Sequence, residues 1–401
     1  MSRLEPTNEA SAMQKEISAI AEQGGGTTKV EQLIQQYCPD GVEYKRLGDI
    51  CKLARGTRVV KKDLSINGAY PVYQNSLKPL GYYDQFNRAE ETTFIICAGA
   101  AGDIGYSKVK FWSADDCFSV ICPDTISNRY VFYCLLSQQN RIYSQVRKAS
   151  IPRLSHSAVE ALYIPVPPLP VQEEIVRILD TFAELQAELQ AELQKRLQQY
   201  NYYRDKLLSF NELNRGGQNV SVEWKKLEDC CQILDNKRKP ITKGARVAGE
   251  YPYYGANGVQ DYVANYIFDG KYVLVGEDGS VITPSGTPVV NWAEGKIWVN
   301  NHAHIISEKK GVLLRYLFHY LQTINITPLI HGNIPKLTGG DFRALTIPVP
   351  PLSVQEEIVR ILDRFSALTN DITAGLPAEI EARRKQYEYY REQLLTFKQK
   401  A

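Results

Sequence analysis

The chain has 401 residues, which at about 100–200 residues per domain predicts two to four domains. Its 47 basic and 45 acidic side chains give a net charge of +2. This balance excludes a histone-like polycation but not a DNA-binding protein, because a phosphate group responds to local charge. The sequence has no run of about eighteen apolar residues, no apolar signal core at its N-terminus and no CxxC pair among its eight cysteines. We therefore expect a cytoplasmic protein with reduced thiols and no membrane association.

Residues 1–40 are predicted to be an N-terminal extension that is partly flexible. A Gly-Gly-Gly triplet at 24–26 interrupts it, and the stretch Lys29–Tyr37 is predicted to form a short helix. Residues 41–165 contain short β-rich runs such as Thr93–Cys97, which are separated by clusters of Gly and Asn. This pattern predicts an irregular globule that contains β-sheet.

Residues 166–215 are predicted to form a long helix. Pro167 and Pro168 stop the preceding segment and mark a helix start, and no Gly or Pro occurs between Val171 and Phe210. A helix of this length would extend for about 60 Å and would need a partner helix to cover its apolar stripe. The stripe consists of leucines that recur every four residues, within and just beyond three tandem Ala-Glu-Leu-Gln tetrapeptides: Leu185, Leu189, Leu193 and Leu197.

The second part of the chain repeats the first. The segment Val171–Asp180 recurs without change as Val354–Asp363, an offset of 183 residues, which indicates an internal duplication. Residues 220–346 are therefore predicted to form a second globule and residues 347–401 a second helical segment. Together these patterns predict an α+β fold with internal pseudo-twofold symmetry. Its two globular domains would be separated by an antiparallel pair of long α-helices that form a coiled coil.

The sequence shows no catalytic constellation. It lacks GxSxG, HExxH, GxGxxG and Walker-type motifs, and it lacks the Asn/Asp-Pro-Pro-Tyr/Phe tetrapeptide of an amino-methyltransferase site. Glu277 and Asp278 are interpreted as polar residues of a hairpin tip, with no carboxylate counterpart in residues 99–102. His302 and His304 would share one face of a strand, but no third ligand is evident, so no metal site is expected. These absences favour a binding protein.

Two variable globules thus alternate with two nearly identical helical segments. Each segment opens with IPVPPL-x-VQEEIVRILD, and the copies continue toward QYNYYRDKLLSF and QYEYYREQLLTF. This arrangement resembles the DNA-specificity subunit of type I restriction-modification systems over residues 41–401. The stretches Asp40–Tyr44 and Ile151–Leu154 also look like the starts and ends of this family's domains.

The resemblance implies that both globules are target-recognition domains, each of which reads one half of a split, asymmetric double-stranded DNA sequence. It also implies that the helices set the spacer length and dock modification (methyltransferase) subunits. The chain itself would be non-catalytic and would bind no cofactor or metal. Modification subunits would use S-adenosylmethionine, and restriction subunits, as ATP-dependent translocases and endonucleases, would use ATP and Mg²⁺. Because tetrapeptide copy number alters spacer length in the family, deletion of residues 187–190, about 6 Å of helix, is predicted to shorten the spacer by roughly one base pair.

Basic runs follow the first strand of each globule, and their equivalent location favours contact with DNA phosphates or base edges over solvated loops. Residues 43–165 carry a net charge of +5 and residues 222–347 carry +2, whereas residues 171–215 carry −2. Asn and Gln side chains can form paired hydrogen bonds with adenine, and Arg can do so with guanine. The alternative is that these Asn and Gln residues only form turns. The predicted DNA-binding residues of the first globule are Arg55, Arg58, Lys61, Lys62, Gln74, Asn75, Lys148 and Arg153. Those of the second are Lys237, Arg238, Lys239, Lys243, Arg246, Asn257, Gln260, His331, Asn333 and Lys336.

The sequence leaves two other functions open. The chain could be the separate target-recognition part of a combined restriction-and-modification enzyme, or a coiled-coil adaptor whose globules bind protein. Salt-dependent protection of a split DNA sequence would distinguish the DNA-reading proteins from the adaptor. Co-purification with a methyltransferase, or with a fused nuclease-methylase, would distinguish the two DNA-reading proteins from each other.

Overall fold

The computed structural model describes residues 28–65, 67–210, 221–370 and 375–400. The predicted flexible glycine triplet lies outside these residues. The chain divides into unit 1, with Met1–Gln190 and Ile380–Ala401, and unit 2, with Ala191–Glu379. Among the described residues, no helix combines the length and the apolar character needed to cross a membrane.

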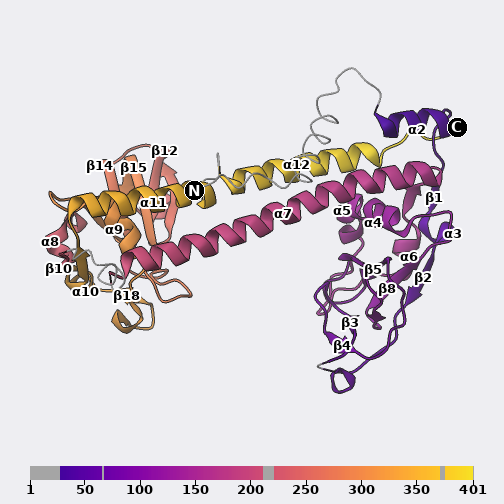
Figure 1. The fold of residues 1–401 in the computed structure, drawn as a ribbon, viewed down its shortest axis with the longest axis horizontal. Helices are drawn as coiled ribbons and strands as arrows, with labels where there is room; N and C mark the ends of the chain where they lie inside the picture. The colour runs from indigo at the N-terminus through magenta and orange to yellow at the C-terminus, as the bar shows by residue number, and fades with distance from the viewer. Residues whose placement is uncertain (1–27, 66, 211–220, 371–374, 401) are drawn as a thin grey trace. The chain divides into compact units, whose positions relative to one another are not determined.

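Unit 1 contains a short N-terminal helix, a globule of small sheets and helices, and parts of two long helices (Figure 1). Its main sheet is antiparallel with the order β2-β8-β5-β6, a second sheet has the order β4-β3-β7, and β1 pairs with β9. The elements are α2 (Lys29–Tyr37), β1 (Tyr44–Arg46), α3 (Leu47–Ile50), β2 (Lys52–Arg55), the 3₁₀ helix η1 (Lys61–Asp63), β3 (Tyr70–Tyr73), β4 (Gly81–Tyr83), β5 (Thr92–Ile96), β6 (Ile104–Ser107), β7 (Trp112–Ser113), β8 (Cys117–Ile121), α4 (Asn128–Ser137), α5 (Gln139–Ser144), α6 (His156–Glu160), β9 (Tyr163–Pro165), the first half of α7 (Leu169–Leu208) and most of α12 (Leu376–Leu394).

The short helix α2 occupies the predicted residues, and a capping box fixes its start. The Thr28 hydroxyl accepts a hydrogen bond from the Glu31 backbone N–H (3.3 Å), and the Glu31 carboxylate accepts one from the Thr28 N–H (2.7 Å). Two N–H groups that an isolated helix start would leave unpaired are thereby satisfied.

The long helix α7 begins at Leu169 and ends at Leu208, inside the predicted helical segment 166–215. Within unit 1 it packs against α12, where the buried Phe182 stacks on Tyr390 with ring centroids 5.3 Å apart. Tyr44 pairs with Pro165, just before α7, and its hydroxyl donates to the backbone carbonyl of Phe397, just after α12 (3.2 Å). The end of α12 therefore lies beside the start of α7, so the two helices run antiparallel here.

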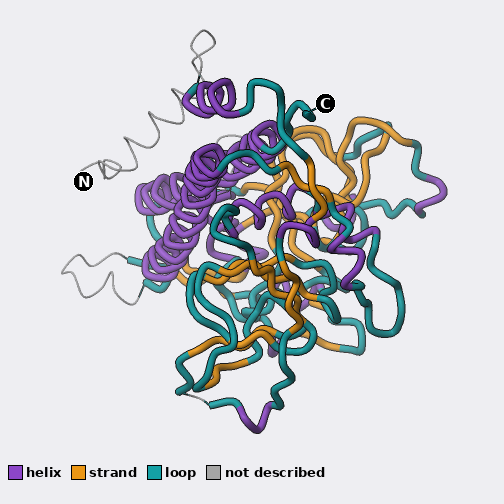
Figure 2. Tube along the Cα trace, turned by 90° about the vertical axis from the view of Figure 1, so that its right-hand side faces the viewer, coloured by secondary structure: helices purple, strands orange, loops and turns teal. Residues whose placement is uncertain are grey.

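Unit 2 is built around one larger sheet with the order β11-β16-β14-β15-β12-β13, and β10 pairs with β19 and β17 with β18. Its strands and helices alternate with long loops, as they do in unit 1 (Figure 2). The elements are the second half of α7, β10 (Glu223–Lys226), α8 (Leu227–Cys230), β11 (Cys231–Ile233), η2 (Asp235–Lys237), η3 (Lys243–Ala245), β12 (Ala248–Gly255), β13 (Gly258–Val263), β14 (Phe268–Gly276), β15 (Val290–Val299), β16 (Ala303–Glu308), α9 (Leu314–Leu321), η4 (Thr327–Leu329), β17 (Ile330–His331), β18 (Lys336–Leu337), α10 (Gly339–Ala344), β19 (Thr346–Val349), α11 (Leu352–Asn370) and the first turn of α12.

The second helical segment differs from the first because it consists of two helices in the described residues. Helix α11 ends at Asn370 and α12 begins at Leu376. Pro377 is the second residue of α12, a position where a missing backbone N–H is tolerated. In the interior of one continuous helix the same proline would remove a hydrogen bond and clash with the preceding turn.

The duplication is confirmed by matching contacts in the two units. Gln172 and Gln355 are both fully buried at the starts of α7 and α11. Each donates its amide to a proline carbonyl of the preceding segment, Gln172 to Pro167 (2.7 Å) and Gln355 to Pro350 (2.8 Å). The same residues thus join the globule to its helix in each copy.

Candidate nucleic-acid interface

In unit 1, a loop near the end of the globule joins the loop that follows β5. The Leu154 N–H donates to the carbonyl of Cys97 (2.9 Å), and the Gly99 N–H donates to the carbonyl of Pro152 (3.3 Å). Arg153 lies between these bonds and forms a bridge with Ala98. We call this contact the loop junction of unit 1.

The predicted amide pair reaches the same junction. The Asn75 carbonyl accepts a hydrogen bond from the Ala100 N–H (2.9 Å), and the Gln74 carbonyl accepts one from the Cys117 thiol (3.0 Å). Asn75 is exposed and Gln74 is half-buried. Backbone bonds therefore hold this loop, and the Asn75 side chain stays available to a ligand.

Arg55, at the end of β2, lies next to the junction as well. Its Nε donates to the carbonyl of Asp115 (3.1 Å), two residues before Cys117. Burial, as the largest cause, raises the pKa of the Cys97 thiol to about 11, and the nearby Arg55 and Arg153 oppose this rise. Both guanidinium groups therefore act on one buried thiol, which places two positive charges around the junction.

The other predicted residues of unit 1 are also exposed. Arg58 lies in the loop after β2, Lys61 and Lys62 form part of η1, and Lys148 follows α5. Among the described residues, none of these four cations forms an ion pair, and neither do Arg55 and Arg153. Among the described residues, no acidic side chain therefore neutralises these charges.

In unit 2 the same backbone contacts form a second loop junction. The Leu337 N–H donates to the carbonyl of Glu277 (2.8 Å), the Gly279 N–H donates to Pro335 (3.0 Å), and Lys336 bridges Asp278. This register corrects the sequence comparison of the acidic pair with residues 99–102.

The counterparts of that pair are Cys97 and Ala98, because Leu154 bonds to Cys97 as Leu337 bonds to Glu277. No carboxylate occupies the equivalent place in unit 1, as the sequence comparison also concluded. The two junctions thus share a backbone arrangement and differ in their side chains.

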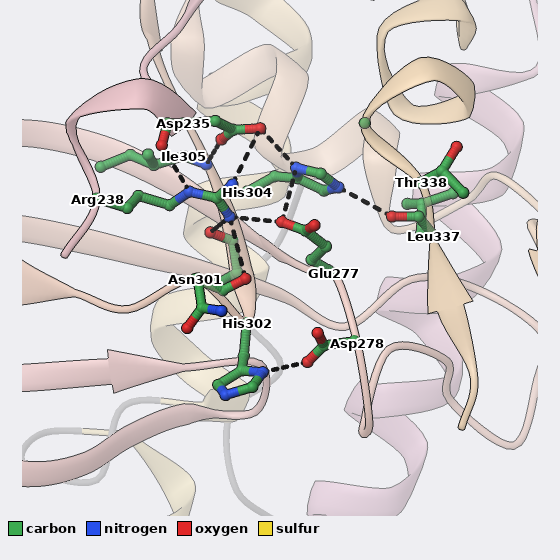
Figure 3. Close-up of polar contacts among 12 residues, drawn as sticks. Asp235, Arg238, Glu277, Asp278, Asn301, His302, His304, Ile305, Leu337 and Thr338 are labelled. Carbon is green, nitrogen blue, oxygen red and sulfur yellow. Dashed lines mark hydrogen bonds and ion pairs between the residues drawn. The ribbon is translucent and has the colours of Figure 1, made fainter. Parts of the chain in front are cut away.

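A network of charged side chains supports the unit 2 junction (Figure 3). Arg238 donates to the Glu277 carboxylate (2.6 Å) and to the carbonyl of Ala303 (2.7 Å). His304, 1% exposed, contacts the Asp235 carboxylate through Nδ1 (2.7 Å) and the carbonyl of Leu337 through Nε2 (3.1 Å).

The Asp235 carboxylate is stabilised in its charged form within this network. Burial, the largest single cause, would raise its pKa, but the hydrogen bond and charge of His304 and the charge of Arg238 outweigh burial and lower the pKa. The His304 ring also stacks on Phe342 at 4.2 Å and is nearly parallel to it. The network therefore fixes the position of the strand that carries Lys336 and Leu337.

Asp235, Glu277 and His304 have the types and closeness of metal ligands, since their donor atoms lie within 4.8 Å of one another. The arrangement nevertheless does not fit a metal ion. Both ring nitrogens of His304 face oxygen acceptors, and Arg238 already binds Glu277. A metal would have to displace Arg238 from Glu277 and take the place of an oxygen that a ring nitrogen of His304 already contacts. We interpret the group as an ion-pair network.

Sequence reasoning missed this network because its members come from separate strands and loops. It considered His302 and His304 as a pair on one strand face. The structure instead turns His302, which precedes β16, toward Asp278, whereas His304 faces Asp235 (Figure 3). The spacing of the two histidines in the sequence could not predict that they contact two different carboxylates.

Two predicted DNA contacts of unit 2 are engaged inside the domain. The Arg238 side chain is only 12% exposed, and Arg246, 15% exposed, binds Asp261 (3.3 Å) and the carbonyl of Ile241 (3.2 Å). Neither guanidinium group is presented to solvent as the basic run suggested.

The remaining predicted residues of unit 2 are exposed. Lys336 shares its charge with Glu277 (3.6 Å), His331 lies near Asp341 (3.7 Å), and the Gln260 amide accepts a weak bond from Asn300 (3.4 Å). The other exposed side chains are those of Lys237, Lys239, Lys243, Asn257 and Asn333.

The leucine stripe of α7 is divided between the units. Leu185 is 8% exposed and belongs to the core of unit 1, where Leu189 packs against it. Leu193 and Leu197 are half-buried in the part of the helix that belongs to unit 2. The stripe therefore contributes to both units.

Comparisons with known proteins agree with this architecture. A family model described as the type I restriction modification DNA specificity domain matches residues 39–199 and again residues 219–382. A Haemophilus influenzae protein described as a type I restriction enzyme specificity subunit is 45% identical over 179 residues, 43% of this chain and 46% of that protein.

The Escherichia coli EcoR124I/EcoR124II specificity subunit is 29% identical over 413 residues, 89% of this chain and 94% of that protein. The crystal structure of a type I restriction-modification S subunit from M. genitalium has the same fold. It superposes with a TM-score of 0.67 at 17% identity and covers 88% of this chain and 96% of that one.

Proposed function

The chain belongs to the family of type I restriction-modification DNA specificity proteins, and from this premise we propose that each unit reads one half of a split DNA target. The observation that carries this proposal is the repeated loop junction. Both junctions use the same backbone bonds, and exposed Arg, Lys and Asn side chains lie around them. Because these side chains differ between the units, the two half-sites should differ and the target should be asymmetric.

In unit 1 we assign the main DNA contacts to Arg55, Asn75 and Arg153. Arginine presents a planar fork that matches the acceptor atoms of guanine or a phosphate, and asparagine can pair with adenine. Neither arginine forms an ion pair among the described residues, so no such pair has to be broken before DNA binds, although the Arg55 Nε also donates to the carbonyl of Asp115. In unit 2 the corresponding contacts are assigned to Lys336 and Asn257.

The chain would act within a larger assembly. We propose that modification subunits supply methyl transfer with S-adenosylmethionine and that restriction subunits supply ATP- and Mg²⁺-dependent translocation and cleavage. This chain would contribute binding and orientation of the DNA and would carry out no chemical step itself. The repeated helical segments are proposed to dock the modification subunits.

Methylome sequencing of cells that express the chain with its modification subunit tests this function. We expect methylated adenines in one asymmetric motif with two defined halves and an undefined spacer. A single undivided motif, or no methylation that depends on this chain, would contradict the proposal. Catalytically inactive modification subunit is the matched control.

Deletion of Ala187–Gln190 tests the role of the helix in the same assay. The deletion removes one Ala-Glu-Leu-Gln tetrapeptide from α7, about 6 Å of helix, and keeps the leucine spacing. Both half-motifs should persist, with a spacer shorter by roughly one base pair. An unchanged spacer would mean that the tetrapeptide is only helix-forming sequence.

A further inference from the structure

Unit 1 contains two cysteines that face each other at one end of its main sheet. Strands β2 and β8 are antiparallel, and Lys52 pairs with Ile121 (Figure 1). The next positions in this register are Cys51, just before β2, and Cys122, just after β8. Residues opposite each other in an antiparallel pair have Cβ atoms about 4.5–5.5 Å apart, close to the separation that a disulfide spans. The register therefore brings the two thiols together.

The two thiols are in direct contact. Their Sγ atoms lie 2.6 Å apart, and either thiol can donate to the other. The Asn128 side chain helps to fix the second thiol, because its amide donates to the Cys122 Sγ (3.8 Å) and to the carbonyl of Val120 (2.7 Å). Among the described residues, which include all eight cysteines, no other two thiols form such a contact. Little movement is therefore needed to join this pair.

Cys122 gives a reagent access to the pair. It is half-buried, whereas the other seven cysteines, Cys51 included, are buried. The hydrogen bond with Cys51 and burial raise the pKa of the Cys122 thiol. The thiolate is the form that reacts with disulfides, so exchange at this pair should be slow near neutral pH and faster in mild alkali.

Unit 2 has the same register but lacks the second thiol. Helix α8 corresponds to α3, so Cys231 corresponds to Cys51, and it pairs with Glu308 on the neighbouring strand β16. The Glu308 carboxylate accepts a hydrogen bond from the Leu314 N–H (3.0 Å), and the Cys231 thiol donates to the carbonyl of Leu227 (3.2 Å). At this position only unit 1 can therefore be cross-linked.

We propose that Cys51 and Cys122 are an oxidation site that closes to a disulfide in unit 1 alone, with a small-molecule disulfide as the oxidant. The Cys122 thiolate attacks one sulfur of glutathione disulfide, whose S–S bond breaks and releases one glutathione. The Cys51 thiolate then attacks the Cys122 Sγ of the mixed disulfide and releases the second glutathione. The two protein thiols lose two electrons and two protons, and the two glutathione thiols receive them.

The bridge would give unit 1 a second, more stable state. Cys51 and Cys122 are 71 positions apart, and the loop between them contains every strand from β2 to β8. A cross-link over so long a loop restricts the unfolded chain and thereby favours the folded one. Arg55 lies at the other end of β2, about 13 Å along the strand from Cys51, so the bridge leaves the loop junction free. Oxidation should therefore stabilise unit 1 and leave its DNA affinity unchanged within about twofold.

Peptide mapping of the full chain tests the site. The folded chain is incubated with glutathione disulfide in mild alkali, quenched in acid, alkylated and digested without reduction. Mass spectrometry should find the peptides of Cys51 and Cys122 joined, with two hydrogens lost and neither thiol alkylated. Cys122→Ser should abolish the link, and Cys51→Ser should leave one glutathione on Cys122. Cys231→Ser, which removes the equivalent thiol of unit 2, is the matched control and should keep the link.

Transfer of the site to unit 2 provides a gain-of-function test. Glu308→Cys places a second thiol opposite Cys231 in the same register, so oxidation should now join these two residues as well. Failure of this variant to form the second link would show that the register is not sufficient to make the site.

Hydrogen exchange measures the effect of the bridge on each unit. Oxidation of the wild-type chain should slow exchange of the β2 amides about tenfold or more and should leave the β11 amides of unit 2 unchanged. The reduced Cys122→Ser chain should match the reduced wild-type chain, which shows that the variant is folded.

Three outcomes would overturn the inference. A glutathione adduct that persists on Cys122 of the wild-type chain would show that Cys51 does not reach it. A link from Cys122 to another cysteine, in higher yield than the link to Cys51, would assign the site to a different pair. Equal slowing of exchange in β2 and β11 would mean that the oxidant does not act through this bridge. DNA binding of the reduced wild-type chain, measured in parallel, reports separately on the proposed function.

Discussion

The two loop junctions form the same backbone hydrogen bonds but carry different side chains. In each, a leucine N–H donates to the residue that follows a central strand, Leu154 to Cys97 in unit 1 and Leu337 to Glu277 in unit 2. Because the backbone makes these bonds, they do not depend on which side chains are present. The loops can therefore keep their positions while the exposed side chains change, which is what two different half-sites would require.

The side chains that are buried beside the two junctions differ in the free energy that their burial costs. Unit 1 places an uncharged thiol under exposed cations, whereas unit 2 buries the charges of Asp235, Glu277 and Arg238. Buried ions lose their hydration, and the loss is offset only while every charge keeps its partner. Unit 2 should therefore be more sensitive than unit 1 to removal of a single side chain.

Glu277→Ala should have the largest expected effect, a loss of stability in unit 2. It removes the nearer carboxylate partner of the buried Arg238 (2.6 Å) and leaves only Asp235 at 3.7 Å, and it should lower the free energy of unfolding of unit 2 by about 3 kcal/mol. The matched Cys97→Ala substitution in unit 1 should cost about 1 kcal/mol. Hydrogen exchange of peptides from β14 and β5, followed by mass spectrometry, would measure the two units separately in one chain. Equal losses in both units would show that the charged network is not what holds the second junction.

Removal of a cation at either junction should have an intermediate effect, measured as a loss of DNA affinity. The loss should be larger for unit 1 than for unit 2. Arg153→Ala removes a charge that has no ion pair among the described residues and should weaken DNA binding by about 1–2 kcal/mol. Lys336→Ala should weaken it less, because Glu277 already compensates part of that charge at 3.6 Å. Salt titrations with the reconstituted modification complex would measure both, and Arg153→Ala should also reduce the salt dependence. A larger loss for Lys336→Ala would reverse the assignment of the stronger reader.

The contrast between the units also shows which features could be predicted from the sequence alone. The duplication, the bounds of α2 and the approximate start of α7 follow from repeats, prolines and periodicity, which are local signals. The engagement of Arg238 and Arg246 could not be predicted from them, because their partners Glu277 and Asp261 come from strands far along the chain. A basic run indicates where cations occur but not which of them remain free.

The exposure of equivalent side chains on the two repeated helices could not be predicted from the sequence either. Glu174 and Glu357 occupy the same position in identical decapeptides, yet one is 5% and the other 55% exposed. In unit 1 the Lys29 ammonium of α2 binds Glu174, whereas Glu357 has no second cation among the described residues. Identical sequence therefore specifies the helix, while tertiary context decides which of its side chains are covered.

The smallest expected effect concerns the contact between each globule and its repeated helix. In unit 1 the Asp180 carboxylate binds Tyr133, and in unit 2 the Asp363 carboxylate binds the equivalent His319 (2.7 Å). Tyr133 stays neutral near neutral pH, because burial raises its pKa. Burial lowers the pKa of His319 from its ordinary value of 6.5, and this effect outweighs the hydrogen bond to Asp363. The folded unit 2 therefore favours a neutral imidazole.

This difference predicts a pH response in unit 2 alone. Below the ordinary histidine pKa, the unfolded chain binds a proton that the folded unit resists, so stability should fall as the pH drops through 6.5 toward the lower folded pKa. His319→Tyr, which copies unit 1, should remove this part of the slope, and Tyr133→His should introduce one into unit 1. Urea unfolding followed by hydrogen exchange between about pH 7.5 and pH 5 would measure both variants. The pKa of Asp363 is also lowered, so this carboxylate titrates below its ordinary value of 3.8 and outside the window. An unchanged slope in His319→Tyr would mean that the buried imidazole is protonated in both states and that the carboxylate, not burial, sets its charge.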